Sequence, residues 1–267
     1  MTYTTVDGIT LHYEDLGSGR PLVLLHGWGT SGRVWDAQAA GLSDDHRVIT
    51  LDWRGCGRSD RPASGYTIDR LASDVLEFID VLGLDRPVLV GSSIAGAFVI
   101  EAALRAPERI GAIVPVDSGV QHFSTRPEAK QAMADLFEGL RADRAGTLAG
   151  FVPHWYAPGT SAALIDRTVR QVLDATPRID GLAADQAEYD PRERLPALRV
   201  PTHFLHGELD TEVPLSVPRE LLGLIPGARL TVIEGAGHMP QQERPDAFNQ
   251  ALRAALNRPE TPSAYRS

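Results

Sequence analysis

The chain has 267 residues, of which 43% are hydrophobic and 23% charged, so composition alone predicts one globular domain with a single buried core. Its net charge of −9 disfavours nucleic-acid binding, which relies on Lys and Arg to neutralise phosphates, and its lone cysteine, Cys56, excludes a disulfide framework. Because the first residues lack a secretion signal and no run of about 18 apolar residues occurs, we expect a cytoplasmic protein with no membrane partner.

Apolar runs of strand length alternate along the chain with amphipathic stretches. The predicted strands are Thr10 to Leu16, Pro21 to His26, Arg47 to Asp52, Pro87 to Val90, Ile110 to Asp117, Thr202 to His206 and Arg229 to Ile233. The predicted helices are Ser31 to Leu42, Ile68 to Leu82, Ile94 to Ala106 and Pro240 to Leu256. Most runs are apolar on both faces, as buried parallel strands are. The alternation therefore predicts an α/β fold in which helices wrap a sheet.

The segment from 119 to 195 interrupts this pattern. It contains no long apolar run and places aromatic residues among charged helix formers, including Phe123, Phe137, Phe151, Trp155 and Tyr156. The alternating pattern returns at Val200. We therefore predict a core made of residues 1–118 and 196–267, with residues 119–195 inserted between two strands as a helical cap. The tail from Arg258 to Ser267 is expected to fray.

The stretch from Val88 to Gly96 reads VLVGSSIAG and takes a predicted strand into a predicted helix. It resembles the nucleophile elbow G-x-S-x-G, in which a strained serine requires small residues two positions before and after it. Gly91 and Ala95 meet that demand for Ser93, although Ala95 replaces the usual glycine. Ser92 has Val and Ile at the same spacing. A phosphate-binding helix start is the alternative interpretation.

A serine nucleophile needs a histidine to accept its proton and an acid to orient that histidine. His238 ends the loop GAGH between the last predicted strand and the last predicted helix. Asp210 lies in the loop HGELDTEVP, directly after the predicted strand 202–206. Asp117, at the end of another predicted strand, remains a competing acid. In the same loop as Asp210, Glu208 and Glu212 are expected to be exposed charges.

Together these motifs resemble the α/β-hydrolase fold family, in its serine esterase and cofactor-free haloperoxidase (perhydrolase) branch. The turn from Leu24 to Gly29 is similar to the family's HG-x-G turn, and the segment from Asp52 to Asp60 matches its D-x-R-G-x-G-x-S motif. The resemblance implies a mostly parallel eight-stranded sheet flanked by helices. It also implies a triad of Ser93, Asp210 and His238, and an oxyanion hole formed by the backbone N–H groups of Trp28 and Ile94.

The resemblance implies hydrolysis of a small carboxylic ester or lactone through an acyl-enzyme, without a metal or an organic cofactor. The expected substrate pocket includes Trp28, His122, Phe123 and Trp155, and His154 is a further candidate in the insertion. Perhydrolysis, carbon–carbon bond hydrolysis and acyl transfer on the same triad remain alternatives, and a non-catalytic ligand-binding protein is a third class. Comparing turnover of ester substrates with binding separates these classes. A homo-oligomer is compatible with the sequence.

Overall fold

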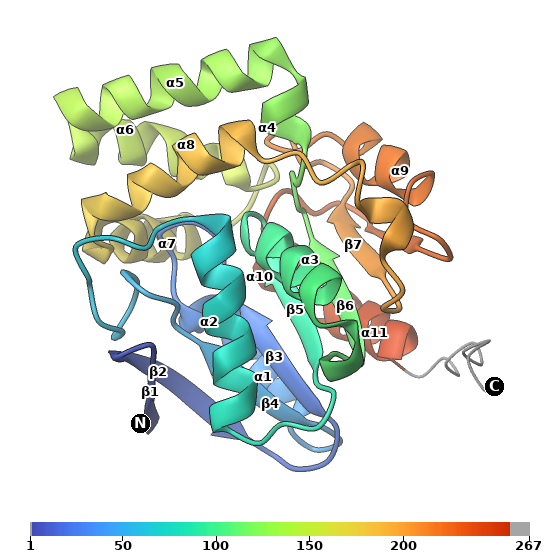
Figure 1. Cartoon of the computed structure of the whole chain (residues 1–267). Helices are drawn as coiled ribbons and strands as arrows, with labels where there is room; N and C mark the ends of the chain where they lie inside the picture. Colours follow the sequence, from blue (N-terminus) through green and yellow to red (C-terminus); the bar gives the residue numbers. More distant parts are fainter. Residues whose placement is uncertain (1, 257–267) are drawn as a thin grey trace.

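The computed structural model describes residues 2–256, which form an eight-stranded sheet flanked by helices (Figure 1). The strands lie in the order β1-β2-β4-β3-β5-β6-β7-β8. The pairs β1–β2 and β2–β4 are antiparallel, and the later pairs are parallel. The strands are β1 (Thr2–Val6), β2 (Ile9–Leu16), β3 (Pro21–Leu25), β4 (Arg47–Leu51), β5 (Val88–Ser92), β6 (Ala112–Val116), β7 (His203–Gly207) and β8 (Arg229–Ile233). The predicted α/β fold is confirmed.

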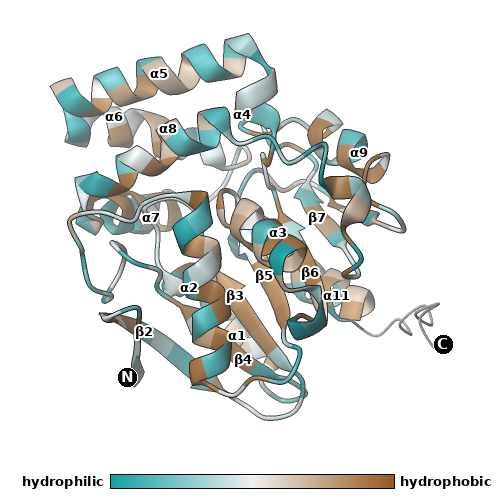
Figure 2. Cartoon of the chain, viewed as in Figure 1, coloured by the Kyte–Doolittle hydropathy of each residue, from teal (hydrophilic) through white to brown (hydrophobic). Residues whose placement is uncertain are grey.

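Helices cover both faces of this sheet. Outside the insertion they are α1 (Asp36–Leu42), α2 (Ile68–Val81), α3 (Ala95–Arg105), α9 (Ser216–Leu222), α10 (Pro240–Glu243) and α11 (Pro245–Leu256). Along β3, Val23 and Leu25 pack with α2 and α3 on one face, while Leu22 and Leu24 pack with α1 and α11 on the other. Figure 2 accordingly shows the central strands as hydrophobic along their length. Burial on both faces explains why these strands lack a polar alternation.

Three local features differ from the sequence prediction. The edge strand β1 is polar and was not predicted, although Asp7 and Gly8, both with positive φ, form the kind of turn that joins two hairpin strands. The helix α9 was also not predicted. The predicted helix 240–256 is two helices that are interrupted at Arg244, because the residue before a proline, here Pro245, disfavours helical geometry.

The insertion is helical, as predicted. Its helices are α4 (His122–Thr125), α5 (Pro127–Ala142), α6 (Arg144–Phe151), α7 (Ala162–Asp174) and α8 (Gly181–Glu188), with a 3₁₀ turn, η3 (Val152–Trp155), between α6 and α7. In Figure 1 they lie beyond the ends of the central strands. Residues of this segment join both hydrophobic clusters of the sheet, among them Val152 and Ile179. The division into a core (1–118 and 196–267) and a cap (119–195) remains our proposal.

Two further sequence expectations concern the ends of the chain and membranes. The tail predicted to fray, Arg258 to Ser267, lies outside the described residues. Within residues 2–256, every helix is too short or too polar to cross a bilayer.

Candidate active site

Ser93 occupies a strained turn between β5 and α3. Its φ is 53°, in the left-handed region that non-glycine residues rarely adopt. The turn is tight, because a Cβ at Gly91 would collide with the carbonyl group of Ala95. A Cβ at Gly27 would lie 3.2 Å from the Ser93 Cβ, so the loop after β3 also requires a small residue here. The small-residue spacing predicted for an elbow therefore has a direct steric cause.

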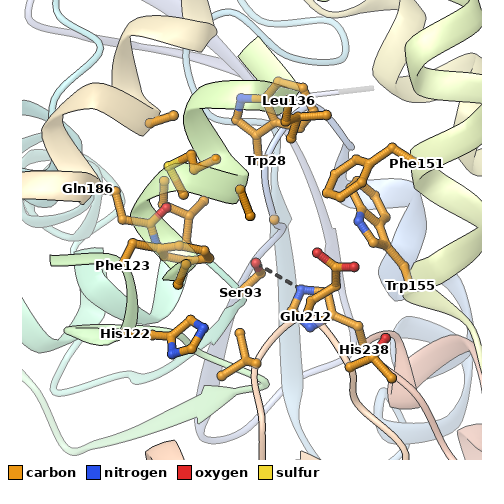
Figure 3. A pocket seen from close by; sticks show the side chains of 18 of the residues that line it. Trp28, Ser93, His122, Phe123, Leu136, Phe151, Trp155, Gln186, Glu212 and His238 are labelled. Atoms are coloured by element: carbon orange, nitrogen blue, oxygen red, sulfur yellow. Dashed lines mark hydrogen bonds between the residues drawn. The ribbon is translucent and has the colours of Figure 1, made fainter. Parts of the chain in front are cut away.

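Three side chains from separate parts of the chain form a hydrogen-bonded row (Figure 3). The Oγ of Ser93 lies 3.0 Å from Nε2 of His238, in the loop after β8. The Nδ1 of His238 lies 2.8 Å from Oδ2 of Asp210, in the loop after β7. Asp210 is fixed in turn, since its Oδ1 accepts the backbone N–H groups of Glu212 at 2.9 Å and Val213 at 3.0 Å. The structure thus brings the three predicted residues together in the geometry of a nucleophile, a base and an orienting acid.

The electrostatics of this row suit proton transfer. Burial lowers the pKa of His238, but the charge of Asp210 and its hydrogen bond, with Glu212 and Glu243, outweigh burial and raise the pKa above its usual value. Burial raises the pKa of Asp210, but the neighbouring His238 holds it below the ordinary range. An ionised Asp210 beside a basic imidazole stabilises the imidazolium that forms when the histidine accepts a proton.

The competing acid, Asp117, has a different environment. It is completely buried, and its Oδ1 accepts the backbone N–H of Gly207 at 2.8 Å. Burial and the adjacent charge of Asp210 raise the pKa of Asp117 well above its usual value. Burial therefore favours the uncharged form of Asp117, and Asp210 is the acid that lies within hydrogen-bond distance of His238.

Asp117, Asp210 and His238 also form the one group in the described part of the chain whose side-chain atoms are close enough to bind a metal, within 4.8 Å of one another. Most of these atoms already serve other partners. Oδ2 of Asp210 is engaged by His238, and its Oδ1 accepts two backbone N–H groups. The hydrogen bonds that these acids and the histidine form therefore explain why the three side chains lie so close together.

The loop that carries His238 is anchored by Glu243. Its Oε1 accepts the N–H groups of Gly237 at 2.9 Å and Met239 at 3.2 Å, on either side of the histidine. Its Oε2 accepts the N–H of Ala157 at 2.7 Å, in the insertion. Glu243 therefore ties the loop of the base to the insertion.

A cavity of about 580 Å³ opens above Ser93. The four predicted pocket residues, Trp28, His122, Phe123 and Trp155, all line it, whereas the fifth candidate, His154, is exposed and does not. The lining also includes Met133, Leu136, Phe137, Phe151, Gln186 and Glu212 (Figure 3). Most of these come from the insertion, so the insertion shapes the space beside the serine.

The sequence interpretation of Glu212 as an exposed charge was wrong. Glu212 is half-buried in this cavity, because the backbone N–H groups that bind Asp210 turn the loop inward. Glu208, in the same loop, is exposed as expected. The sequence signal for Glu212 is its position two residues after the acid, in a loop that must reach the site.

Trp28 and Ile94 both line the cavity next to Ser93. Trp28 follows β3, with its ring edge-on to Phe137 at 5.9 Å and the guanidinium of Arg144 at 5.8 Å from its centroid. Ile94 directly follows the serine. These positions suit the two backbone donors of an oxyanion hole, and that role remains our proposal.

The remaining motifs have structural roles. Asp52 accepts the backbone N–H of Gly32 through Oδ1 and that of Arg58 through Oδ2, and Arg54 forms a buried ion pair with Asp74. Histidines outside the site also have hydrogen-bond partners: His12 contacts Asp52, His203 contacts Thr231, and His206 donates to the carbonyl of Val213.

Comparisons with known proteins show the family to which the chain belongs. The model of the alpha/beta hydrolase fold family matches residues 20–245, so the chain belongs to that family. It is 31% identical to the AB hydrolase superfamily protein YisY of Bacillus subtilis, over 93% of this chain and 96% of that one. An esterase from Exiguobacterium antarcticum superposes with a TM-score of 0.91 at 28% identity, covering 96% of this chain and 99% of that one. A bromoperoxidase from Bacillus anthracis gives a TM-score of 0.89 at 27% identity, covering 96% and 100%.

Proposed function

We propose that this protein is a serine hydrolase that cleaves a small carboxylic ester or lactone through an acyl-enzyme. The observation that carries the proposal is the row from Ser93 through His238 to Asp210, which ends at the floor of an apolar cavity. Membership of the α/β-hydrolase family and similarity to an esterase support it.

The geometry supports a two-step reaction. Oγ of Ser93 attacks the substrate carbonyl while Nε2 of His238 takes the hydroxyl proton, and the N–H groups of Trp28 and Ile94 stabilise the developing oxyanion. His238 then gives the proton to the leaving alcohol, and the C–O bond breaks to leave an ester on Ser93. A water molecule then attacks that ester while His238 takes one of its protons. His238 returns this proton to Oγ of Ser93 as the carboxylic acid leaves.

The cavity limits the substrate to a small molecule. A volume of about 580 Å³ is typical of small-ligand sites, and the lining is mainly apolar and aromatic. We propose that the insertion acts as a cap that sets substrate size, because it supplies most of that lining.

Perhydrolysis is the second candidate, supported by similarity to a bromoperoxidase. In that reaction hydrogen peroxide replaces water in the attack on the acyl-enzyme and releases a peracid. The expectations of cytoplasmic location, of no nucleic-acid or membrane partner and of a homo-oligomer remain predictions.

A panel of nitrophenyl esters, simple lactones and a peracid assay tests the proposal, with Ser93→Ala as the control. We expect hydrolysis of at least one short ester or lactone that Ser93→Ala lacks. Ligand binding without turnover of any of these compounds would instead favour the non-catalytic class. A rate of peracid formation above the rate of ester hydrolysis would favour the second candidate.

A further inference from the structure

Glu212 places a carboxylate in the cavity beside the row of three residues. Its backbone is held in place, because its N–H and that of Val213 donate to Oδ1 of Asp210. Its side chain is half-buried and lines the cavity. Glu212 and His238 are close enough for the charge of each to affect the pKa of the other.

This carboxylate has no hydrogen-bond or ion-pair partner within residues 2–256. The cationic side chain of the lining, Arg126, is paired with Glu220 at 2.9 Å. Burial, and then Arg126, lower the pKa of His122, so that residue is neutral. Glu128 adds a second negative charge but is exposed. Within the described residues, the cavity beside Ser93 thus contains a carboxylate, that of Glu212, with no ion-pair partner among the side chains that line it.

Aromatic rings form the wall on the Glu212 side of the cavity. Phe151 and Trp155 pack edge-on at 5.6 Å, and the ring of Trp155 lies 6.3 Å from that of His238. Figure 3 shows the Glu212 carboxylate pointing into the cavity on the side of these two rings. The loop of Glu212 meets the same wall, since Thr211 donates to the carbonyl of His154 at 3.4 Å. Aromatic faces and a carboxylate together are the features that bind ammonium groups.

We propose that Glu212, Phe151 and Trp155 form a subsite for an ammonium group, and that the preferred substrates are esters of amino alcohols. The position of the subsite relative to His238 indicates which part of the ester, the acyl group or the alcohol, carries the ammonium group. His238 gives its proton to the leaving alcohol, so the alcohol portion lies on the His238 side, where Glu212 and Trp155 also lie. This inference rests on the proposed ester hydrolysis.

A pair of esters of equal shape tests the subsite. Butyrylcholine carries a trimethylammonium group, and 3,3-dimethylbutyl butyrate carries an uncharged tert-butyl group in the same place. Both are measured at pH 8, at which Glu212 is more fully ionised than at lower pH. We expect kcat/KM for the cationic ester to exceed that for the neutral ester by about tenfold or more. Any change in the basicity of His238 affects both esters and cancels in the ratio.

Glu212→Gln removes the charge while keeping the shape, and it should bring the ratio down to about one. Glu208→Gln is the matched control, because Glu208 belongs to the same loop but is exposed and does not line the cavity. That variant should keep the wild-type ratio. A wild-type ratio near one, or an unchanged ratio in Glu212→Gln, would overturn the subsite.

Choline binding gives a readout that needs no turnover. Titration calorimetry on Ser93→Ala should show choline binding more tightly than 3,3-dimethylbutanol, and Glu212→Gln in that background should remove the difference. Equal binding of the two compounds would overturn the subsite even if the esters are hydrolysed. If neither ester is hydrolysed faster by the wild type than by Ser93→Ala while a nitrophenyl ester or lactone is, the substrate inference alone fails. If no ester or lactone shows turnover that depends on Ser93, the proposed hydrolysis fails as well.

Discussion

Asp210→Asn isolates the contribution of the orienting carboxylate. In the wild type, Oδ2 of Asp210 accepts the Nδ1 proton of His238 at 2.8 Å, which leaves Nε2 free to face Ser93. Asparagine keeps an acceptor for the N–H groups of Glu212 and Val213 at Oδ1, so it places its NH₂ group against Nδ1. The histidine then adopts the tautomer with the proton on Nε2, which no longer accepts the serine proton.

The expected loss follows from that tautomer. The equivalent change in the serine-protease triad lowers kcat by about 10⁴, which corresponds to about 5.4 kcal/mol of transition-state stabilisation. Asp117→Asn should cost less than about tenfold, because burial already favours the uncharged form of Asp117 and an amide still accepts the N–H of Gly207. The assay is kcat on one activated ester, with circular dichroism to confirm folding. If Asp117→Asn is crippled while Asp210→Asn stays active, the assignment of the acid is wrong.

Three further predictions address the base, the cap and the core. The raised pKa of His238 should make kcat/KM fall as the pH decreases through a midpoint above pH 6.5. Glu212→Gln should move this midpoint to lower pH, because it removes a negative charge that favours the imidazolium. A midpoint that does not move contradicts the prediction. Trp155→Ala should shift the preference among butyrate esters of different alcohols more than it lowers the urea midpoint, and an unchanged preference profile refutes that role. Arg54→Ala should cost about 2–3 kcal/mol in urea unfolding, because it removes two hydrogen bonds from the buried Asp74 carboxylate and leaves Arg70 as its remaining cation; a loss below about 1 kcal/mol would show that Arg70 alone is sufficient.

The row of Ser93, His238 and Asp210, which we propose is catalytic, was predictable from sequence because each member depends on local constraints. Ser93 needs small neighbours at Gly91 and Ala95, and those positions adjoin it in the chain. Asp210 and His238 follow strands whose apolar runs are evident, and the ends of parallel strands meet at one edge of the sheet.

The choice between two buried acids and the lining of the cavity were harder to predict. Asp117 and Asp210 both follow strands, and only the packing shows that burial and the charge of Asp210 raise the pKa of Asp117. Glu212 looked like a loop charge because the cavity that it lines is completed by residues such as Phe151 and Trp155, which lie more than fifty positions earlier in the chain. Contacts between segments so distant in sequence leave no local pattern.

Labelling with a fluorophosphonate tests the central claim most directly, because the reagent forms a covalent bond with a serine only where a base activates it. Ser92 is the internal control: it adjoins Ser93 but is completely buried, with no hydrogen-bond partner for its Oγ among the described residues. We predict that peptide mass spectrometry finds one label per chain, on Ser93. The label should persist in Ser92→Ala, be absent from Ser93→Ala and form far more slowly in Asp210→Asn. A label on Ser92, or one retained in Ser93→Ala, would contradict the assignment of the nucleophile.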